Sequence, residues 1–287
     1  MSKIGFQFDQ HPWLSLLTII ITEVVAQALC AVIVVGVVKL PRDAPLTGFL
    51  ITTLAHVIAL LVVVPFMLRL PSGARSFQTY LDDIRLSQLQ PLVRLVLLGL
   101  SCYLILALCQ ASGVLVYRVL EGKPLTGAFL RSLFDLSGDL PPKSWSLLVS
   151  LPSIFEEVAF RGVVLALFLS YYSQPKAVVF AALGFGAMHL LNLAAGRELA
   201  WVLGQAVWAT ILGLFYGYLV LKSGSLLPAM LVHYLSNLFI GSLTAYLQSS
   251  ASLQTQVVYG ILFSFGLVPT TLMILWVWLF TKLRPIV

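Results

Sequence analysis

Long runs of apolar residues recur along the whole chain and define its predicted architecture. Each run has about 20 residues, the length of helix that crosses a hydrocarbon layer roughly 30 Å thick. Eight runs are present, at residues 13–38, 46–68, 91–117, 145–169, 177–194, 200–221, 226–247 and 257–280. Because backbone polar groups cannot stay unpaired in lipid, and the runs are too long for barrel strands, each run is predicted to be a helix. The pattern predicts an all-α polytopic transmembrane bundle of about eight helices.

The composition agrees with a membrane protein and excludes an ordinary soluble domain. Hydrophobic residues make up 60% of the 287 residues and charged residues only 10%, and the mean hydropathy is +0.99. The net charge of +6 does not indicate nucleic-acid binding, because the basic residues are scattered at the predicted helix ends. Contact with anionic lipid headgroups explains them better. We therefore expect a lipid bilayer, and no nucleic acid, among the partners.

The distribution of lysine and arginine favours an amino terminus on the inner side of the membrane by nine residues to seven. In that orientation the inner side holds Lys3, Arg69, Arg75, Arg85, Arg94, Lys176, Lys222, Lys282 and Arg284. The outer side holds Lys39, Arg42, Arg118, Lys123, Arg131, Lys143 and Arg197. Basic residues concentrate on the cytoplasmic side of membrane proteins, so both termini are predicted to lie inside.

Residues 1–287 are predicted to form one membrane domain. The first apolar run lacks an obvious small-residue cleavage site, so we interpret it as a retained helix and not as a signal peptide. Within the longer connection at residues 118–144, apolar residues near helical spacing at 129–136 predict a short interfacial helix. The three cysteines fall inside apolar runs and indicate neither a disulfide framework nor a metal site.

Charged residues enter the fourth apolar run in the segment Phe155-Glu156-Glu157-Val158-Ala159-Phe160-Arg161-Gly162. Ionisable groups within a membrane cost on the order of 3 kcal/mol each, so they usually face a bundle interior and serve a function. Glu157 and Arg161 stand four apart and share a helix face, whereas Glu156 is rotated by about 100° from Glu157. This predicts an orienting Glu157–Arg161 ion pair and leaves Glu156 free to act on a substrate or a water. Pro152, one turn earlier, is expected to loosen the helix and admit water.

Two later apolar runs each contain a histidine. His189 ends a segment in which Gly184 and Gly186 allow close approach of a neighbouring helix. His233 and Asn237 stand four apart, so an imidazole and an amide point the same way. Both groups can donate to an oxyanion, and preorganised donors in a dry site are among the largest contributions to acyl-transfer catalysis. With the two glutamates, these residues are suited to hydrolysing a peptide bond inside a membrane; hydrogen bonding between helices is the alternative for each motif.

The ordered set Glu156-Glu157-x-x-x-Arg161, Phe185-x-x-x-His189 and His233-x-x-x-Asn237 resembles the CPBP family of intramembrane proteases. That family includes the type II CAAX prenyl endopeptidases and the bacteriocin-processing or immunity proteins. Each motif alone is weak, but the three in this order are specific. The resemblance covers a motif-bearing catalytic core at about residues 145–247, and it implies an intramembrane endopeptidase.

The resemblance also implies roles for the motif residues. Glu156 would be the general base that activates water, assisted by His189. His233 and Asn237 would stabilise the oxyanion of the tetrahedral intermediate. The other two charged residues of the first motif would hold the base and its helix in place.

The resemblance does not decide whether the reaction requires a metal ion. Family members are commonly described as metalloproteases, and Glu156, His189 and His233 are candidates for a three-ligand Zn²⁺ site with an open position for water. If Glu156 were a ligand it could not also be a free base, and Glu157 would have to take that role. Spacing does not decide between these versions; we favour a glutamate-activated water without an obligatory metal.

Other intramembrane protease chemistries lack their residues. The chain has no His-Glu-x-x-His pair for a zinc helix and no Gly-x-Ser-x-Gly elbow. None of its six aspartates lies within a predicted span, which argues against a paired-aspartate mechanism.

Two further ionisable residues lie in the first two spans. Glu23, with Gln27 on the same face, and His56 are assigned to hydrogen bonding between helices, because neither belongs to a motif set. Asn192 and Gln205 are interpreted in the same way. A role in contacting substrate is the alternative for Glu23 and His56.

Two other functional classes compete with a peptidase. Buried acids, an arginine and histidines also suit a proton-coupled transporter, although no inverted repeats are evident. A catalytically silent immunity or scaffold protein would use the same fold to bind a partner in the membrane. For a peptidase, the substrate would be a membrane-associated peptide, such as a prenylated CAAX-type carboxy terminus or a leader peptide. The compact length favours the plasma membrane of a bacterium.

Overall fold

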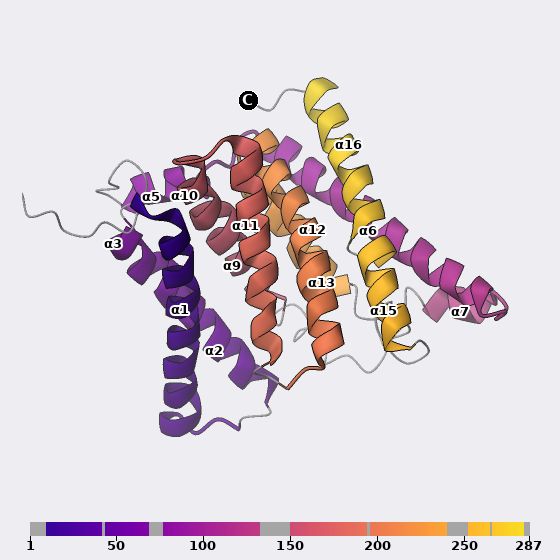
Figure 1. Ribbon diagram of the computed structural model, residues 1–287, viewed down its shortest axis with the longest axis horizontal. Helices are drawn as coiled ribbons and strands as arrows, with labels where there is room; N and C mark the ends of the chain where they lie inside the picture. Colours follow the sequence, from indigo (N-terminus) through magenta and orange to yellow (C-terminus); the bar gives the residue numbers. More distant parts are fainter. Residues whose placement is uncertain are drawn as a thin grey trace, which may run out of the picture.

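The computed structural model describes residues 10–41, 44–68, 77–132, 150–193, 196–239, 252–264 and 266–283, and in this part of the chain every regular element is helical. Figure 1 shows a bundle of long helices that run alternately up and down. The all-α polytopic bundle predicted from the apolar runs is therefore confirmed.

Among the residues described in the first half of the chain are three long helical segments and two short ones. The first is α1 (Pro12–Ala31), continued by a π-helical segment at Val32–Val37. The second comprises α2 (Pro45–Ile58), a π-helical segment at Ala59–Val63 and α3 (Val64–Leu68). The short helix α5 (Phe77–Asp83), the long α6 (Leu92–Leu120) and the short α7 (Gly127–Ser132) follow.

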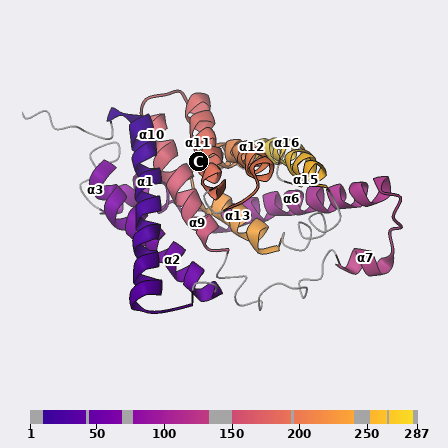
Figure 2. The same cartoon turned by 60° about the horizontal axis from the view of Figure 1, so that its bottom comes forward.

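The second half carries the motif residues. It comprises α9 (Pro152–Glu157), a π-helical segment at Val158–Val164, α10 (Leu165–Leu169), α11 (Gln174–Met188) with a 3-10 turn at His189–Leu193, α12 (Leu199–Ser223), α13 (Leu227–Phe239), α15 (Leu253–Tyr259), a π-helical segment at Gly260–Ser264 and α16 (Leu267–Leu283). In Figures 1 and 2, α9 to α13 lie between α1 with α2 on one side and α6 with α16 on the other.

Six helical segments among the described residues are long and apolar enough to cross a membrane. They are Pro12–Val37, Leu46–Met67, Leu92–Leu120, Gln174–Leu193, Leu199–Ser223 and Gln254–Leu283. Many of their leucine and valine side chains, such as Val32, Val93 and Leu275, are more than half exposed on the outside of the bundle, where they would contact lipid. The protein is an integral, multi-pass membrane protein.

The other two predicted spans are also helical over most of their described residues. The fourth, Pro152–Leu169, contains three charged residues, and the seventh, α13, is described as far as Phe239. Residues 145–149 and 240–247 of these predicted spans lie outside the described residues, as do residues 133–136 of the predicted interfacial helix, which begins as α7.

Pro152 has a different effect from the one expected. It begins α9 instead of interrupting a longer helix, a position that suits proline because its missing N–H would be unpaired in the first turn anyway. The distortion of this span lies after the two glutamates, in the π-helical segment Val158–Val164. π-Helical turns inside α-helices are often found at functional sites.

Close packing of α11 on α12 fixes the position of α11, the helix that ends at His189. A Cβ atom added at Gly186 would lie 2.6 Å from the carbonyl oxygen of Ala206, and one added at Gly213 would lie 3.0 Å from the backbone of Ala182. Only glycine allows this separation of the two helices. The close approach predicted from Gly184 and Gly186 is confirmed, with Gly184 packed against Leu16 of α1.

Candidate active site

Glu157 is the centre of the site and is completely buried, with 0% of its surface exposed. Its Oε1 atom accepts a hydrogen bond of 3.1 Å from Nη1 of Arg161, one helical turn along the same span. The same oxygen lies 2.8 Å from Nδ1 of His233 on α13. The ion pair that the four-residue spacing allows is therefore present, and it is extended to a second helix by the histidine.

Arg161 is held between two aromatic rings. Its guanidinium carbon lies 4.1 Å from the ring centre of Phe185 on α11 and 5.0 Å from that of Tyr216 on α12. Stacking on aromatic faces favours a guanidinium, and more strongly where water is excluded. A buried arginine thus joins the span that carries the glutamates to both neighbouring helices.

The orientation of His233 follows from its neighbours. A carboxylate only accepts hydrogen bonds, so Nδ1 of His233 carries the proton directed at Glu157. Tyr216 stacks on the imidazole, with ring centres 5.4 Å apart and planes at 21°. The remaining nitrogen, Nε2, lies 3.8 Å from Oε2 of Glu156. The structure therefore brings Glu156, Glu157, Arg161 and His233 into one cluster, with Nε2 of the histidine facing the free glutamate.

Glu156 faces a cavity of about 110 Å³. Its side chain is 24% exposed, whereas that of Glu157 is completely buried. The polar part of the cavity wall consists of Glu156 with four residues from the first two spans: Glu23, Gln27, Thr52 and His56. The rest of the wall is apolar. The division of the two glutamates into a buried one and an accessible one agrees with their predicted rotation.

His189 lies next to this cluster without contacting either glutamate. It caps α11, and its Nδ1 lies 2.9 Å from the carbonyl oxygen of Phe185, so that nitrogen is the donor. Its ring meets the edge of Phe185 at 4.9 Å, and the same phenylalanine lies 6.1 Å from His233. Among the described residues, His189 has no hydrogen bond or ion pair with Glu156; Phe185 separates the two histidines.

Asn237 stands one turn beyond His233 on α13 and is exposed at the surface of the bundle. It shares the histidine's helix face, as its spacing predicts, but it does not extend the buried cluster.

The residues of the site do not form a metal-binding arrangement. Among the described residues, no three histidine, cysteine or carboxylate side chains lie close enough together to hold a metal ion. His233 directs Nδ1 at Glu157, and the predicted ligand set of Glu156, His189 and His233 is not assembled. We therefore derive no step through a metal.

Two pairs of residues contribute to the site in ways that were not predicted from the sequence. Phe185 and Tyr216 hold the guanidinium and the imidazole, although aromatic residues in apolar runs look like ordinary core. Glu23 and His56 share the cavity of Glu156, although they were assigned to hydrogen bonding between helices. The only signal for this pair was an ionisable residue in each of the first two spans.

The hydrogen bond between Asn192 and Gln205, 2.7 Å long, joins two segments as expected.

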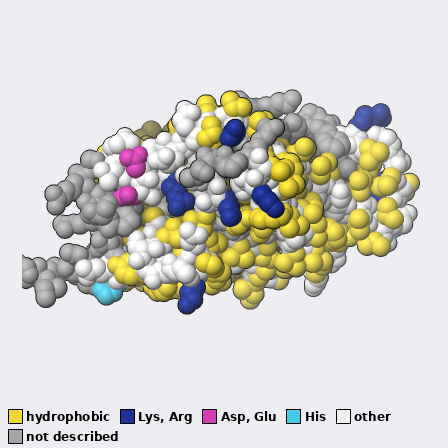
Figure 3. All heavy atoms as spheres, turned by 90° about the horizontal axis from the view of Figure 1, so that it is seen from above, with side chains coloured by type: hydrophobic (Ala, Val, Ile, Leu, Met, Phe, Trp, Pro, Cys, Tyr) yellow, Lys and Arg dark blue, Asp and Glu magenta, His cyan; other side chains and the backbone are white. Residues whose placement is uncertain are grey.

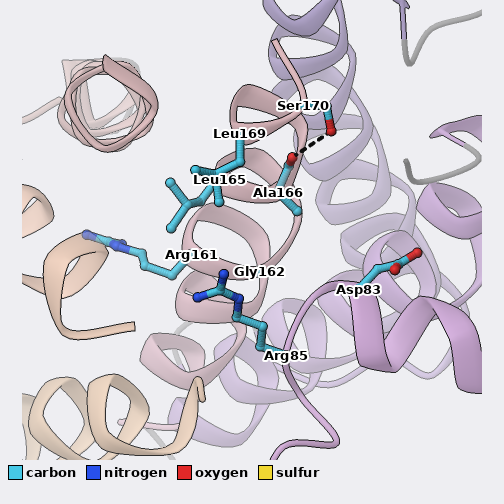
Figure 4. Close-up of a pocket in the computed structure, with 8 residues that line it drawn as sticks. All are labelled: Asp83, Arg85, Arg161, Gly162, Leu165, Ala166, Leu169 and Ser170. Carbon is cyan, nitrogen blue, oxygen red and sulfur yellow. Dashed lines mark hydrogen bonds between the residues drawn. The ribbon is translucent and has the colours of Figure 1, made fainter. Parts of the chain in front are cut away.

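A second cavity, of about 210 Å³, lies on another side of the π-helical segment. Figure 4 shows Arg85 beside Gly162, with Arg161 extending away from it. Arg85 donates to the carbonyl oxygen of Val220 at 3.1 Å. Neither glutamate of the motif nor any histidine lines this cavity, and Arg161 is the one residue of the candidate cluster among its lining residues.

Comparison with known proteins gives one match. A family model described as Type II CAAX prenyl endopeptidase Rce1-like matches residues 140–239. The match covers about a third of the chain, and in this segment the chain is similar to the CAAX prenyl endopeptidases. The segment includes all three motifs, so the resemblance drawn from their order is confirmed. No curated protein and no solved structure matches the chain.

Proposed function

We propose that the protein is an intramembrane endopeptidase that hydrolyses a peptide bond of a membrane-associated peptide. The observation that carries the proposal is the contact of Glu156 with Nε2 of His233, 3.8 Å apart at the edge of a cavity. The family match supports a protease of the CAAX type. The glutamate and the imidazole provide a base and a hydrogen-bonding group at one point inside the membrane.

In the proposed reaction Glu156 acts as the general base. It takes a proton from a water molecule while the water oxygen bonds to the carbonyl carbon of the substrate. The carbon–nitrogen bond then breaks, and the proton passes from Glu156 to the departing nitrogen, which gives a carboxyl group and an amine. One water is consumed and the carboxylate of Glu156 is restored.

The proposed role of His233 is to stabilise the oxyanion. Glu157 accepts from Nδ1 of His233 and so fixes the imidazole ring with Nε2 directed at the site, where Nε2 can donate to an oxyanion when it carries a proton. Asn237, on the same face of α13, is proposed as the second donor when substrate is bound. His189 is proposed to assist Glu156.

Glu157 and Arg161 are proposed as positioning residues. They do not reach the cavity that Glu156 lines, and they act by fixing the imidazole and the helix. The catalytic core is proposed to be about residues 145–247 within a single membrane domain at 1–287.

The substrate class follows from the family and remains part of the proposal. A prenylated CAAX-type carboxy terminus is the first candidate, and a leader peptide is the second. The proposed location is the plasma membrane of a bacterium.

The proposal is tested with purified protein in detergent and a peptide library with and without a lipid group. We expect cleavage by the wild type and a loss of at least 100-fold with Glu156→Gln, which keeps the shape but removes the base. Glu121→Gln is the matched control, because Glu121 is an exposed carboxylate at the end of α6. Cleavage that is equal in wild type and Glu156→Gln would contradict the peptidase.

The role of a metal is tested on the same assay. Because the candidate ligands are not assembled, we expect activity to survive exhaustive chelation. Loss of cleavage on chelation, with recovery on adding Zn²⁺, would instead require a metal that binds together with the substrate.

A further inference from the structure

Glu23 of α1 is a buried carboxylate without a hydrogen bond. The residue is 7% exposed, and neither Oε1 nor Oε2 has a hydrogen-bonding partner among the described residues. A carboxyl group in an apolar interior costs several kcal/mol unless its oxygens are satisfied. If Glu23 only joined helices, it would accept a hydrogen bond from a neighbouring helix. The described residues supply no such bond, so the oxygens of Glu23 are open to a hydrogen-bond donor such as water.

His56 of α2 stands opposite Glu23. Its Nδ1 lies 2.7 Å from the carbonyl oxygen of Thr52 and is therefore the donor there. Its Nε2 lies 3.8 Å from Oε2 of Glu23, too far for a direct hydrogen bond. A polar separation above about 3.5 Å leaves both groups able to hydrogen-bond to water in the cavity that they line. His56 also stacks on Phe155, the residue before Glu156, with ring centres 5.3 Å apart.

The cavity that these residues line is the one that Glu156 faces. Its volume of about 110 Å³ has room for about three water molecules at the roughly 30 Å³ each occupies in the liquid. Glu156 interacts electrostatically with both Glu23 and His56. Gln27 lines the cavity and is also exposed at the surface of the bundle, so polar groups continue from the surface to the glutamates.

We propose that this cavity retains the water that is consumed in hydrolysis, and that Glu23 and His56 position it against Glu156. The inference rests on the proposed peptidase function and identifies where a bilayer-embedded enzyme obtains its second substrate. Glu23 and His56 lie near the midpoints of the spans Pro12–Val37 and Leu46–Met67, far from bulk water on either side. A polar store at that depth keeps a water molecule beside Glu156 before each turnover, and the one consumed is replaced afterwards.

The first experiment compares Glu23→Leu with Glu23→Gln by kinetics and thermal unfolding. A leucine side chain cannot hydrogen-bond to water. For Glu23→Leu we therefore expect kcat to fall at least tenfold, with KM within about twofold of the wild-type value. Glutamine can still hydrogen-bond water and should restore most of kcat. Because leucine removes a buried carboxyl group that has no hydrogen bond among the described residues, Tm should stay equal or rise. A residue that only joined helices would lower Tm on the same change.

Controls separate this inference from the proposed function. Thr53→Val removes a buried hydroxyl that has no hydrogen bond and does not line the cavity, and it should retain wild-type kcat. If Glu156→Gln is inactive while Glu23→Leu and His56→Leu keep full kcat, the water-retaining role is wrong and the peptidase stands. If Glu156→Gln is active, the proposed function itself fails.

A second experiment needs no peptide substrate. Thr52→Cys places a thiol on the cavity wall, whereas Thr53→Cys places one beside it, away from the cavity. A small water-soluble thiol reagent, or Ag⁺, should modify the first much faster than the second, with the unaltered protein as the background because its three cysteines are buried. Equal, slow modification of both variants would show a dry cavity and overturn the inference.

Discussion

The carboxylate of Glu157 holds two other ionisable side chains in place. One oxygen serves Arg161 on its own span and His233 on α13, and Phe185 and Tyr216 enclose the cation. In the proposed peptidase, Glu157 would contribute to catalysis through the imidazole that it orients. Its removal, or removal of its partner, should therefore affect stability and activity in different ways.

Arg161→Met should lower the free energy of unfolding by about 3–5 kcal/mol, because it leaves a buried carboxylate without its cation. The double variant Glu157→Gln with Arg161→Met should recover part of that loss, as expected for residues in direct contact, but no activity, because His233 loses its charged partner. Arg161→Lys should be intermediate, since lysine keeps the charge without the planar stacking. Denaturant unfolding in detergent measures all four proteins. A free energy of unfolding for Arg161→Met equal to that of the wild type would contradict this account.

At this scale the sequence predicts which residues share a helix face. It does not predict their partners on other helices. The spacing of Glu157 and Arg161 gave their ion pair, and the offset of Glu156 gave its separate orientation. No spacing reveals how α13 is rotated against α9, so the contact of His233 Nδ1 with Glu157 came from the structure. Glu23 and His56 were separated from the site for the same reason: they belong to spans with no motif, and only packing brings them to Glu156.

At the scale of elements, α11 depends on its contact with α12. Phe185 and His189 lie on a helix whose Gly186 is pressed against α12 near Ala206 and Thr210. Any change in the separation of the two helices would move the phenylalanine that stacks on Arg161. The helices themselves were predictable because apolar runs of span length have few alternatives in lipid, whereas the π-helical segment after Glu157 leaves no recognisable sequence pattern.

Gly186→Ala should destabilise the protein by about 1–3 kcal/mol, as inserting a methyl group into a packed interface does, and should reduce peptidase activity. The added methyl group would meet the backbone oxygen of Ala206 at 2.6 Å, and backbone cannot move aside as a side chain can. Gly48→Ala is the matched control, since Gly48 lies within α2 with nothing within 4 Å of an added Cβ. It should be neutral or stabilising by up to about 1 kcal/mol. Equal unfolding midpoints for the two variants would contradict the packing argument.

At the scale of the whole molecule, the alternation of helices places basic residues at both ends. Figure 1 shows α12 and α16 ending at the same end of the bundle, and Figure 3, which views that end, shows lysine and arginine side chains gathered over its middle. Lys222 and Lys282 lie in the last turns of these two helices. Arg118 lies in the last turn of α6, which runs the other way. The bundle thus has two basic rims, and the nine-to-seven count from the sequence decides between them only narrowly.

The orientation of the protein is tested with single cysteines at the two rims. Lys222 at the end of α12 and Lys123 beyond α6 are both exposed, and the native cysteines are buried. If the amino terminus is inside, a membrane-impermeant maleimide should label Lys123→Cys in intact cells and Lys222→Cys only after the membrane is opened. The reverse pattern would place the amino terminus outside, because the positive-inside bias is weak here. Labelling of both in intact cells would contradict the alternating helices, since these two positions would then lie on one side.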